Sequence, residues 1–321
     1  MLKKMSKIGA IIVASMMINS LLTSCNTKQA ENEKETSYIY KEYPLIRNDI
    51  SLHLDCVKQE GTETKDNILL VHGVTYSSHE FDIDHEDYSL VRYLARQGYC
   101  VWRLDIAGYG RSQDVKDGFM PDSDYAAEDI NAAVNKIVEI TDQDQIDLLG
   151  WSWGTVTTSR FVIKYPEHIR KLVLYAPIIS GIGFVEVREP FHHNTWEHAA
   201  DDFQKDENGN FDYNTVDPLM IELFCSSSWH YDRESSPNGG RRDICVDSDQ
   251  LLIDLDRISV PTLVICGDKD PYLNYDLVND SLSHLPEGSK LEIIEGASHV
   301  ALAEKPYYRD FQKRLTAFLK Q

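Results

Sequence analysis

Ser152 lies at the centre of the segment Gly150-Trp151-Ser152-Trp153-Gly154, between an apolar run and a stretch typical of a helix. A serine hydroxyl can attack an acyl group once a nearby base takes its proton. Glycines two residues before and two after the serine permit a tight strand-to-helix turn, because they let neighbouring backbone come close. The pattern predicts a nucleophile elbow that presents Ser152 at the edge of a sheet. A glycine-serine turn without function is the alternative.

A histidine base and an acid that orients it follow in the order expected after such a serine. The apolar run 260–266 is followed by Asp268 and Asp270, and the run 291–294 is followed by His299. Open α/β sheets place their sites beyond the carboxyl ends of the strands. We predict that His299 is the base and Asp270 the acid. Asp268 is the second candidate for the acid because it could equally cap the turn, and an ordinary surface loop is the alternative setting for His299.

Backbone amides that stabilise a developing oxyanion are the third requirement of acyl transfer. A strand-like run, 67–71, leads into His72-Gly73-Val74. The amide of Val74 and the amide of Trp153 are the two expected donors, and losing one such donor typically costs roughly 2.7–4 kcal/mol of transition-state stabilisation. His72 itself is expected to be a structural residue of the turn.

Taken together, these motifs resemble those of the α/β-hydrolase superfamily, in the group with a serine nucleophile and an inserted cap. The run from Asp105 to Ser112 is similar to that group's D-x-x-G-x-G-x-S loop, and residues 165–174 fit its passage from helix to strand. The resemblance covers about residues 38–180 and 256–320. Thr155 departs from the pattern, since many relatives have glycine or alanine there. Serine at position 152 argues against epoxide hydrolases and haloalkane dehalogenases, which use aspartate.

The resemblance implies a serine hydrolase that needs neither cofactor nor metal and acts on a small molecule. The scaffold hosts esterases, lipases, thioesterases, amidases, peptidases and carbon-carbon hydrolases, so the fold does not fix the substrate. We expect a carboxylic ester with a small or medium apolar acyl group. An aminopeptidase of the proline iminopeptidase type is the first alternative, because cap carboxylates can bind a free amino terminus; candidates are Glu189, Glu197, Asp201 and Asp202. A non-catalytic binding protein on the same fold is the second.

The elements needed to position these residues follow from the alternation of apolar runs and helical stretches. Such alternation predicts a mostly parallel sheet with helices on both faces. Expected strands are 38–47, 50–58, 67–71, 100–104, 145–149, 172–175, 262–266 and 290–294, and expected helices are 88–97, 125–139, 154–164, 276–283 and 306–320. The core should comprise residues 38–178 and 255–321, with residues 179–254 inserted as a cap over the site.

Two features of the expected cap suggest a metal but have plainer interpretations. The run from Asp206 to Asp212 loosely resembles a calcium loop, yet its sixth place holds Phe211 instead of glycine and its twelfth holds Asp217 instead of glutamate. An Asn-Gly hairpin is favoured. The histidines of this region are expected to be scattered pocket or surface residues and not zinc ligands: His192, His193 and His198.

The first 24 residues resemble a bacterial lipoprotein signal. Three lysines precede an apolar run, 8–22, which is short for a membrane span, and Leu22-Thr23-Ser24-Cys25 has the form of a lipobox. Cys25 would then carry the lipid, and residues 25–37 would be a polar, flexible tether. Asn26 after the cysteine favours the outer membrane by analogy. A non-lipidated secretory signal is the alternative.

Composition and net charge limit the classes of molecule that the protein is expected to bind. The chain has 321 residues, 42% hydrophobic and 26% charged, with a net charge of −20, which becomes −23 when the three lysines of the leader are removed. Such acidity argues against nucleic-acid binding and makes the acyl anchor, not a basic patch, the expected contact with a membrane. Cys100 and Cys266 are expected to be buried thiols. A disulfide between Cys225 and Cys245 is possible in an exported protein.

Overall fold

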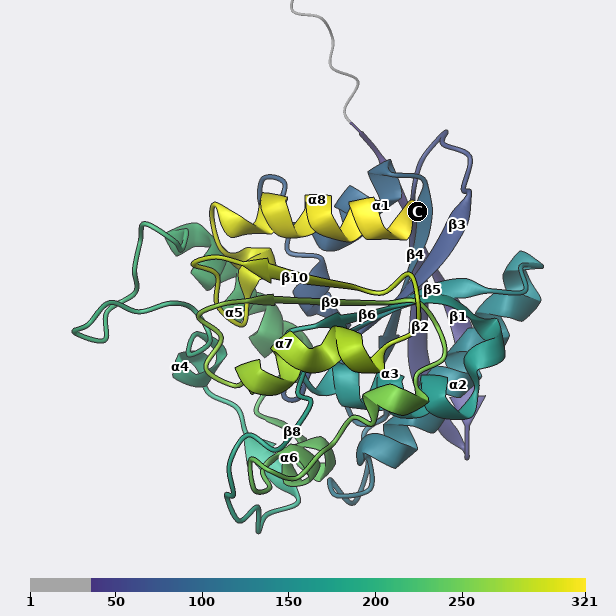
Figure 1. Ribbon diagram of the computed structural model, residues 1–321. Coiled ribbons are helices and arrows are strands. Elements are labelled where there is room, and N and C mark those ends of the chain that lie inside the picture. Colours follow the sequence, from purple (N-terminus) through teal and green to yellow (C-terminus); the bar gives the residue numbers. More distant parts are fainter. Residues whose placement is uncertain (1–35) are drawn as a thin grey trace, which may run out of the picture. The chain divides into compact units, whose positions relative to one another are not determined.

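The computed structural model describes residues 36–321 (Figure 1). The expected leader, Cys25 and most of the tether lie outside the described residues. Within residues 36–321, no helix combines the length and apolar composition that crossing a bilayer requires.

A central sheet of eight strands organises the structure. Its strands are β1 (Tyr38–Arg47), β2 (Ile50–Gln59), β3 (Asp66–Val71), β4 (Tyr99–Asp105), β5 (Ile146–Trp151), β6 (Ile169–Tyr175), β9 (Thr262–Gly267) and β10 (Lys290–Ile294). The strand order is β1-β2-β4-β3-β5-β6-β9-β10. β1 pairs with β2, and β2 with β4, in antiparallel fashion, while the pairings from β4 to β10 are parallel. The carboxyl ends of the parallel strands therefore meet at one edge.

Helices cover both faces of this sheet. They are α1 (Leu90–Arg96), α2 (Ser123–Thr141), α3 (Trp153–Lys164), α4 (Trp196–Ala199), α5 (Pro218–Asp232), α6 (Gly239–Ile244), α7 (Tyr275–His284) and α8 (Tyr307–Leu319), with short 3-10 turns η1 (Ser78–Phe81), η2 (Pro166–His168), η3 (Leu255–Arg257) and η4 (Ala301–Ala303). One apolar core joins α1 and α8 to the sheet, and another joins α2, α3 and α7 to its other face (Figure 1). The predicted fold class, an α/β-hydrolase fold with a mostly parallel sheet, is confirmed.

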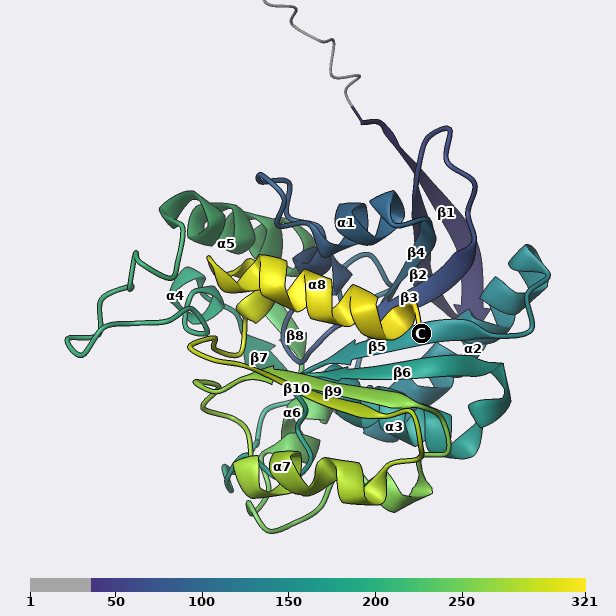
Figure 2. The same ribbon diagram turned by 45° about the horizontal axis from the view of Figure 1, so that its top comes forward.

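The chain between β6 and β9 forms its own small elements. It contains α4, α5, α6 and a two-stranded sheet made by β7 (Phe191–His193) and β8 (Ser235–Pro237). Figure 2 shows α4 and α5 together at one end of the central sheet, away from the carboxyl terminus. Apolar side chains of α5 join the core that contains α1 and α8, while Ile244 at the end of α6 joins the other core. The chain between β6 and β9 therefore packs against both apolar cores. Its residues 179–254, the expected cap, are called the inserted segment below.

The segment that resembles a calcium loop is a hairpin. Lys205 and Phe211 pair as an antiparallel bridge. The carboxylate of Asp206 accepts hydrogen bonds from the backbone amides of Asn208 and Asn210, each at 2.9 Å. The Asp206 oxygens are thus used to hold the turn, as the Asn-Gly interpretation requires.

The cysteine predictions need one correction. Cys100 is not a free thiol but forms a disulfide with Cys56, and the Cα atoms of the two residues are 6.1 Å apart. The cause is the pairing of β2 with β4, which brings together residues separated by 44 positions. Cys266 is a buried thiol, as expected. Cys225 and Cys245 are also buried and free, so the possible disulfide between them is not formed.

Candidate active site

Ser152 occupies a sharp turn between β5 and α3. Its backbone has φ 56° and ψ −122°, a conformation that costs a side-chain-bearing residue about 1–3 kcal/mol. A Cβ on Gly150 would lie 2.2 Å from the carbonyl oxygen of Gly154, and a Cβ on Gly154 would lie 2.6 Å from that of His72. The two glycines are therefore required by close packing, and the strained turn presents Ser152 beyond the end of β5.

His299 and Asp270 meet at the same edge, after β10 and β9. Nδ1 of His299 donates a hydrogen bond of 2.7 Å to Oδ2 of Asp270. Asp268 instead uses Oδ1 to accept a hydrogen bond of 2.7 Å from the amide of Gly296, which fixes the turn before the histidine. The structure thus pairs Asp270, and not Asp268, with His299. Both paired side chains are buried.

Burial and charge act in opposite directions on the His299 imidazole. Burial alone disfavours the imidazolium and lowers the pKa. The carboxylate of Asp270 and the hydrogen bond to it outweigh burial, and Asp202 and Glu304 add to their effect, so the pKa of His299 is raised above the ordinary value of 6.5. A higher pKa makes the imidazole a stronger base, which favours transfer of a proton to it.

The loop that carries His299 is fixed by three buried side chains that sequence analysis did not identify. The backbone carbonyl of His299 accepts hydrogen bonds from the Tyr175 hydroxyl at 2.9 Å and from Nε1 of Trp151 at 3.2 Å. Glu304 holds the preceding residue, because its carboxylate accepts hydrogen bonds from both the amide and the hydroxyl of Ser298. These contacts restrict the position of the imidazole.

The turn 72–75 passes directly beside Ser152. A Cβ on Gly73 would lie 3.2 Å from Cβ of Ser152, so the backbone that carries Val74 runs close to the serine. His72 is neutral here, because Nδ1 donates to the carbonyl of Gly73 at 2.8 Å while Nε2 accepts from the amide of Ile106 at 3.1 Å. Burial lowers the pKa of His72 and supports this state. The histidine is a structural residue of the turn.

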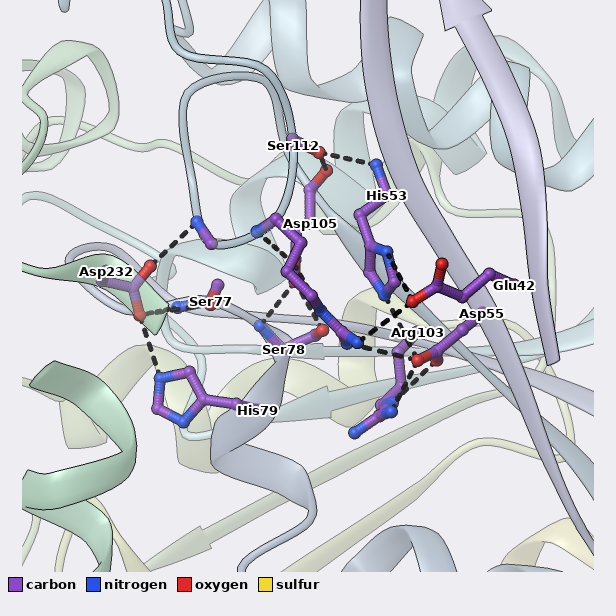
Figure 3. Close-up of polar contacts among 12 residues, drawn as sticks. Glu42, His53, Asp55, Ser77, Ser78, His79, Arg103, Asp105, Ser112 and Asp232 are labelled. Atoms are coloured by element: carbon purple, nitrogen blue, oxygen red, sulfur yellow. Dashed lines mark hydrogen bonds and ion pairs between the residues drawn. The ribbon is translucent and has the colours of Figure 1, made fainter. Parts of the chain in front are cut away.

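A buried polar network holds the chain immediately after this turn (Figure 3). The carboxylate of Asp232, at the end of α5, accepts hydrogen bonds from the amide of Ser77 at 3.0 Å, from its hydroxyl at 3.1 Å and from Nε2 of His79 at 2.9 Å. Asp105 accepts from the amide of Ser78 at 2.9 Å and from that of Arg111 at 3.0 Å. The inserted segment and the D-x-x-G-x-G-x-S loop therefore both anchor the residues that follow Val74.

A cavity with a volume of about 140 Å³ opens onto these groups. Its lining brings together Ser152, His299 and Val74, and the remaining lining residues are Gly73, Thr75, Tyr76, Glu80, Trp151, Ile178, Ile182, His198, Asp201, Asp202, Arg241, Ile244 and Tyr272. The backbone of Trp153 begins α3 directly after Ser152, while its indole points into the core and donates to Ser123 Oγ at 2.9 Å.

Two residues of the cavity wall, Arg241 and Tyr272, belong to no motif that could have revealed them. Arg241 donates a hydrogen bond to the Thr75 hydroxyl at 2.5 Å, which ties α6 to the turn beside Val74. Tyr272 packs its ring edge-on against His299, with ring centroids 4.9 Å apart, and donates to Asp202 at 2.9 Å. Of the carboxylates considered for an amine site, the wall contains Asp201 and Asp202, whereas Glu189 and Glu197 are not among its residues.

The histidines of the inserted segment do not form a metal-ligand group. His192 and His198 pack with ring centroids 4.5 Å apart. Across residues 36–321, one set of three side chains places ligand atoms within 4.8 Å of one another, namely His85, Glu86 and Asp217. That set is partly exposed and is not part of the cavity wall.

Comparison with known proteins identifies the family. Residues 66–306 match the model of the alpha/beta hydrolase fold family, and the chain belongs to this family. A protein of Synechocystis sp. that carries the name of a non-heme chloroperoxidase is 29% identical, with coverage of 72% of this chain and 84% of its own.

Two further relatives carry names of hydrolases. An uncharacterized carboxylesterase of Bacillus subtilis is 23% identical, covering 77% of this chain and 78% of its own. A proline iminopeptidase of Saccharolobus solfataricus is 26% identical, and the match covers 74% of this chain and 80% of the relative. The family and these two relatives support a hydrolase, while the different names accord with a scaffold that hosts many reactions.

Proposed function

We propose that this protein is a serine hydrolase that cleaves a carboxylic ester through an acyl-enzyme. The observation that carries the proposal is the joint placement of Ser152 and His299 on one cavity, with His299 held by Asp270 at 2.7 Å. The strained turn of Ser152 and the raised pKa of His299 support it further.

In this mechanism Ser152 Oγ attacks the carbonyl carbon of the ester while His299 takes the serine proton on Nε2. The tetrahedral oxyanion is stabilised by the amides of Val74 and Trp153. Its collapse breaks the bond to the alkoxy oxygen, and His299 returns the proton to the departing alcohol. Water then attacks the acyl-enzyme by the same two proton transfers, which releases the acid and restores Ser152.

We assign a small or medium apolar acyl group to the cavity because of its apolar side chains. Ile178, Ile182 and Ile244 lie in its wall beside Val74. An aminopeptidase is the second candidate. It is supported by the proline iminopeptidase relative and by Asp201 and Asp202 in the same wall.

The ester preference is tested with nitrophenyl esters from acetate to decanoate, beside aminoacyl nitroanilides that include the prolyl compound. Because an apolar pocket discriminates by roughly 1–3 kcal/mol per methylene, the esters should show a clear optimum in kcat/KM at one chain length. Esters should also react faster than anilides. Faster cleavage of an anilide with a free amino terminus, lost in Asp202→Asn, would replace the ester proposal with an aminopeptidase.

We also propose that the protein is a lipoprotein of the bacterial envelope, anchored through Cys25 and placed more readily at the outer than at the inner membrane. The support is the lipobox in the sequence. Several acyl chains give stable attachment, since each buried methylene contributes about 0.8 kcal/mol.

Labelling of expressing cells with palmitate tests this anchor. The wild type and a Cys245→Ala control should incorporate label and sediment with membranes, because Cys245 is an internal buried thiol. Cys25→Ala should incorporate none. Label that persists in Cys25→Ala would contradict the lipid anchor.

A further inference from the structure

Glu80 lies in the wall of the Ser152 cavity and has a buried carboxyl oxygen that is left unpaired within residues 36–321. It belongs to η1, lines the cavity and is 4% exposed. Its Oε2 atom is buried and has no hydrogen-bond partner among the described residues. A buried polar atom left unpaired costs about 1–3 kcal/mol, so such a group calls for a specific explanation.

The surroundings of Glu80 disfavour its charged form. Burial is the largest influence, and the nearby carboxylates of Asp232, Asp202 and Asp105 act in the same direction, so the pKa of Glu80 is raised well above the ordinary value of 4.5. A protonated carboxyl group is uncharged and carries an O–H donor. Two of the neighbouring carboxylates already accept hydrogen bonds from other residues. Asp232 accepts hydrogen bonds from Ser77 and His79, and Asp105 accepts one from Ser78.

The main chain around Glu80 is held in place. Its amide donates to the carbonyl of Ser77 at 3.3 Å, and the preceding residues Ser77, Ser78 and His79 are each fixed by hydrogen bonds to Asp232 or Asp105. The network of Figure 3 therefore keeps the backbone of η1 beside the cavity. A carboxyl group on a fixed backbone in a cavity wall is preorganised to meet a bound molecule.

We propose that Glu80 is a specificity-determining residue whose uncharged carboxyl group donates a hydrogen bond to an uncharged oxygen of the substrate, such as an ether, a hydroxyl or a second carbonyl. The inference rests on the proposed function and narrows it to esters with an additional oxygen acceptor. An ammonium group is a poorer match, because binding it would require Glu80 to ionise and Arg241 lies in the same wall. Such an acceptor would pair with the O–H of the Glu80 carboxyl group, and an all-methylene substrate would offer that O–H no partner.

The test replaces single methylenes of the substrate by oxygen. Nitrophenyl hexanoate is compared with esters whose acyl chain carries an ether oxygen at each successive position, and alkyl butanoates are compared with alkoxyalkyl butanoates in a pH-stat to probe the alcohol side. The quantity measured is the ratio of kcat/KM for the ether ester to that for its methylene counterpart. Solvation differences between the two esters cancel when this ratio is compared between variants.

Glu80→Leu removes the donor, and Glu80→Gln keeps an uncharged N–H donor of similar shape. At one oxygen position the ratio should fall at least ten-fold in Glu80→Leu and stay within about three-fold of wild type in Glu80→Gln. Rescue by glutamine separates hydrogen bonding from loss of packing. If Glu80→Leu does not accumulate as folded protein, Glu80→Met serves as the second variant without a donor.

Two results would overturn the proposal. Ratios unchanged at every position in Glu80→Leu would mean that Glu80 does not contact the substrate. An amino-substituted hexanoate ester that wild type prefers over the ether esters, and that Glu80→Gln no longer prefers, would mean that Glu80 binds a cation as a carboxylate. Failure of the proposed function is distinguishable, because no ester in the panel would then be hydrolysed and Ser152 would not react with a fluorophosphonate.

Discussion

Ser152→Ala is expected to reduce kcat/KM for esters by about 10⁴-fold or more, because nucleophile and base act as a unit and removal of either leaves only binding and oxyanion stabilisation. A fluorophosphonate, which phosphonylates an activated serine, should label wild-type protein at this residue and should not label the variant. The measurement is turnover of the preferred nitrophenyl ester, with the site of labelling read by peptide mass analysis.

Ser281→Ala is the matched control. Ser281 is also buried and lies in α7, and its hydroxyl has no hydrogen-bond partner among the described residues, so its removal breaks no hydrogen bond there. This variant should keep wild-type turnover and labelling. Undiminished hydrolysis by Ser152→Ala would refute the mechanism, and well-folded wild-type protein that resists labelling would favour a binding protein on a hydrolase fold.

The elements around Ser152 were predictable because their determinants are local. Gly150 and Gly154 are required by contacts within the turn and with the adjacent strand β3, and the apolar runs on either side report burial directly. The expected core strands agree with the observed ones to within one or two residues at most ends. Local pattern and tertiary structure agree here, as they do in sequences that specify one fold.

The sequence could only partly decide whether Asp270 or Asp268 is the acid. Both carboxylates follow the same strand at nearly the same depth, so the sequence places either at the sheet edge. What separates them is the partner that each finds across the turn after β10: the amide of Gly296 for Asp268 and the imidazole of His299 for Asp270. Such contacts depend on loop geometry that no periodicity encodes.

The disulfide and the composition of the cavity wall could not be predicted from the sequence either, because both depend on contacts between distant parts of the chain. Cys56 and Cys100 meet because β2 returns antiparallel beside β4, and chain order alone does not determine which strands are neighbours. Glu80 and Arg241 reach the cavity from two short elements, η1 and α6. The two residues are 161 positions apart, and strands β4, β5 and β6 lie between them in the sequence. Both line one cavity only because the chain folds back between these elements, and local pattern does not report such long-range placement.

Asp270→Asn is expected to lower kcat/KM by about 10³- to 10⁴-fold, because asparagine removes both the charge that stabilises the imidazolium and the acceptor that fixes the tautomer of His299. Asp268→Asn is the matched control. Its Oδ1 can still accept the hydrogen bond from Gly296, so less than a ten-fold loss is expected. The reverse ranking of the two variants would assign the acid to Asp268.

The pH dependence of the same two proteins provides a second measurement with a definite sign. His299 acts as a base only when it is neutral, so kcat/KM falls as the pH drops through its pKa. In wild type that fall should be centred above pH 6.5, since Asp270 raises the pKa of His299 despite its burial. In Asp270→Asn, burial remains and the charge is gone, so the residual activity should persist to lower pH. An acidic limb at the same pH in both proteins would show that Asp270 does not control the titration of His299.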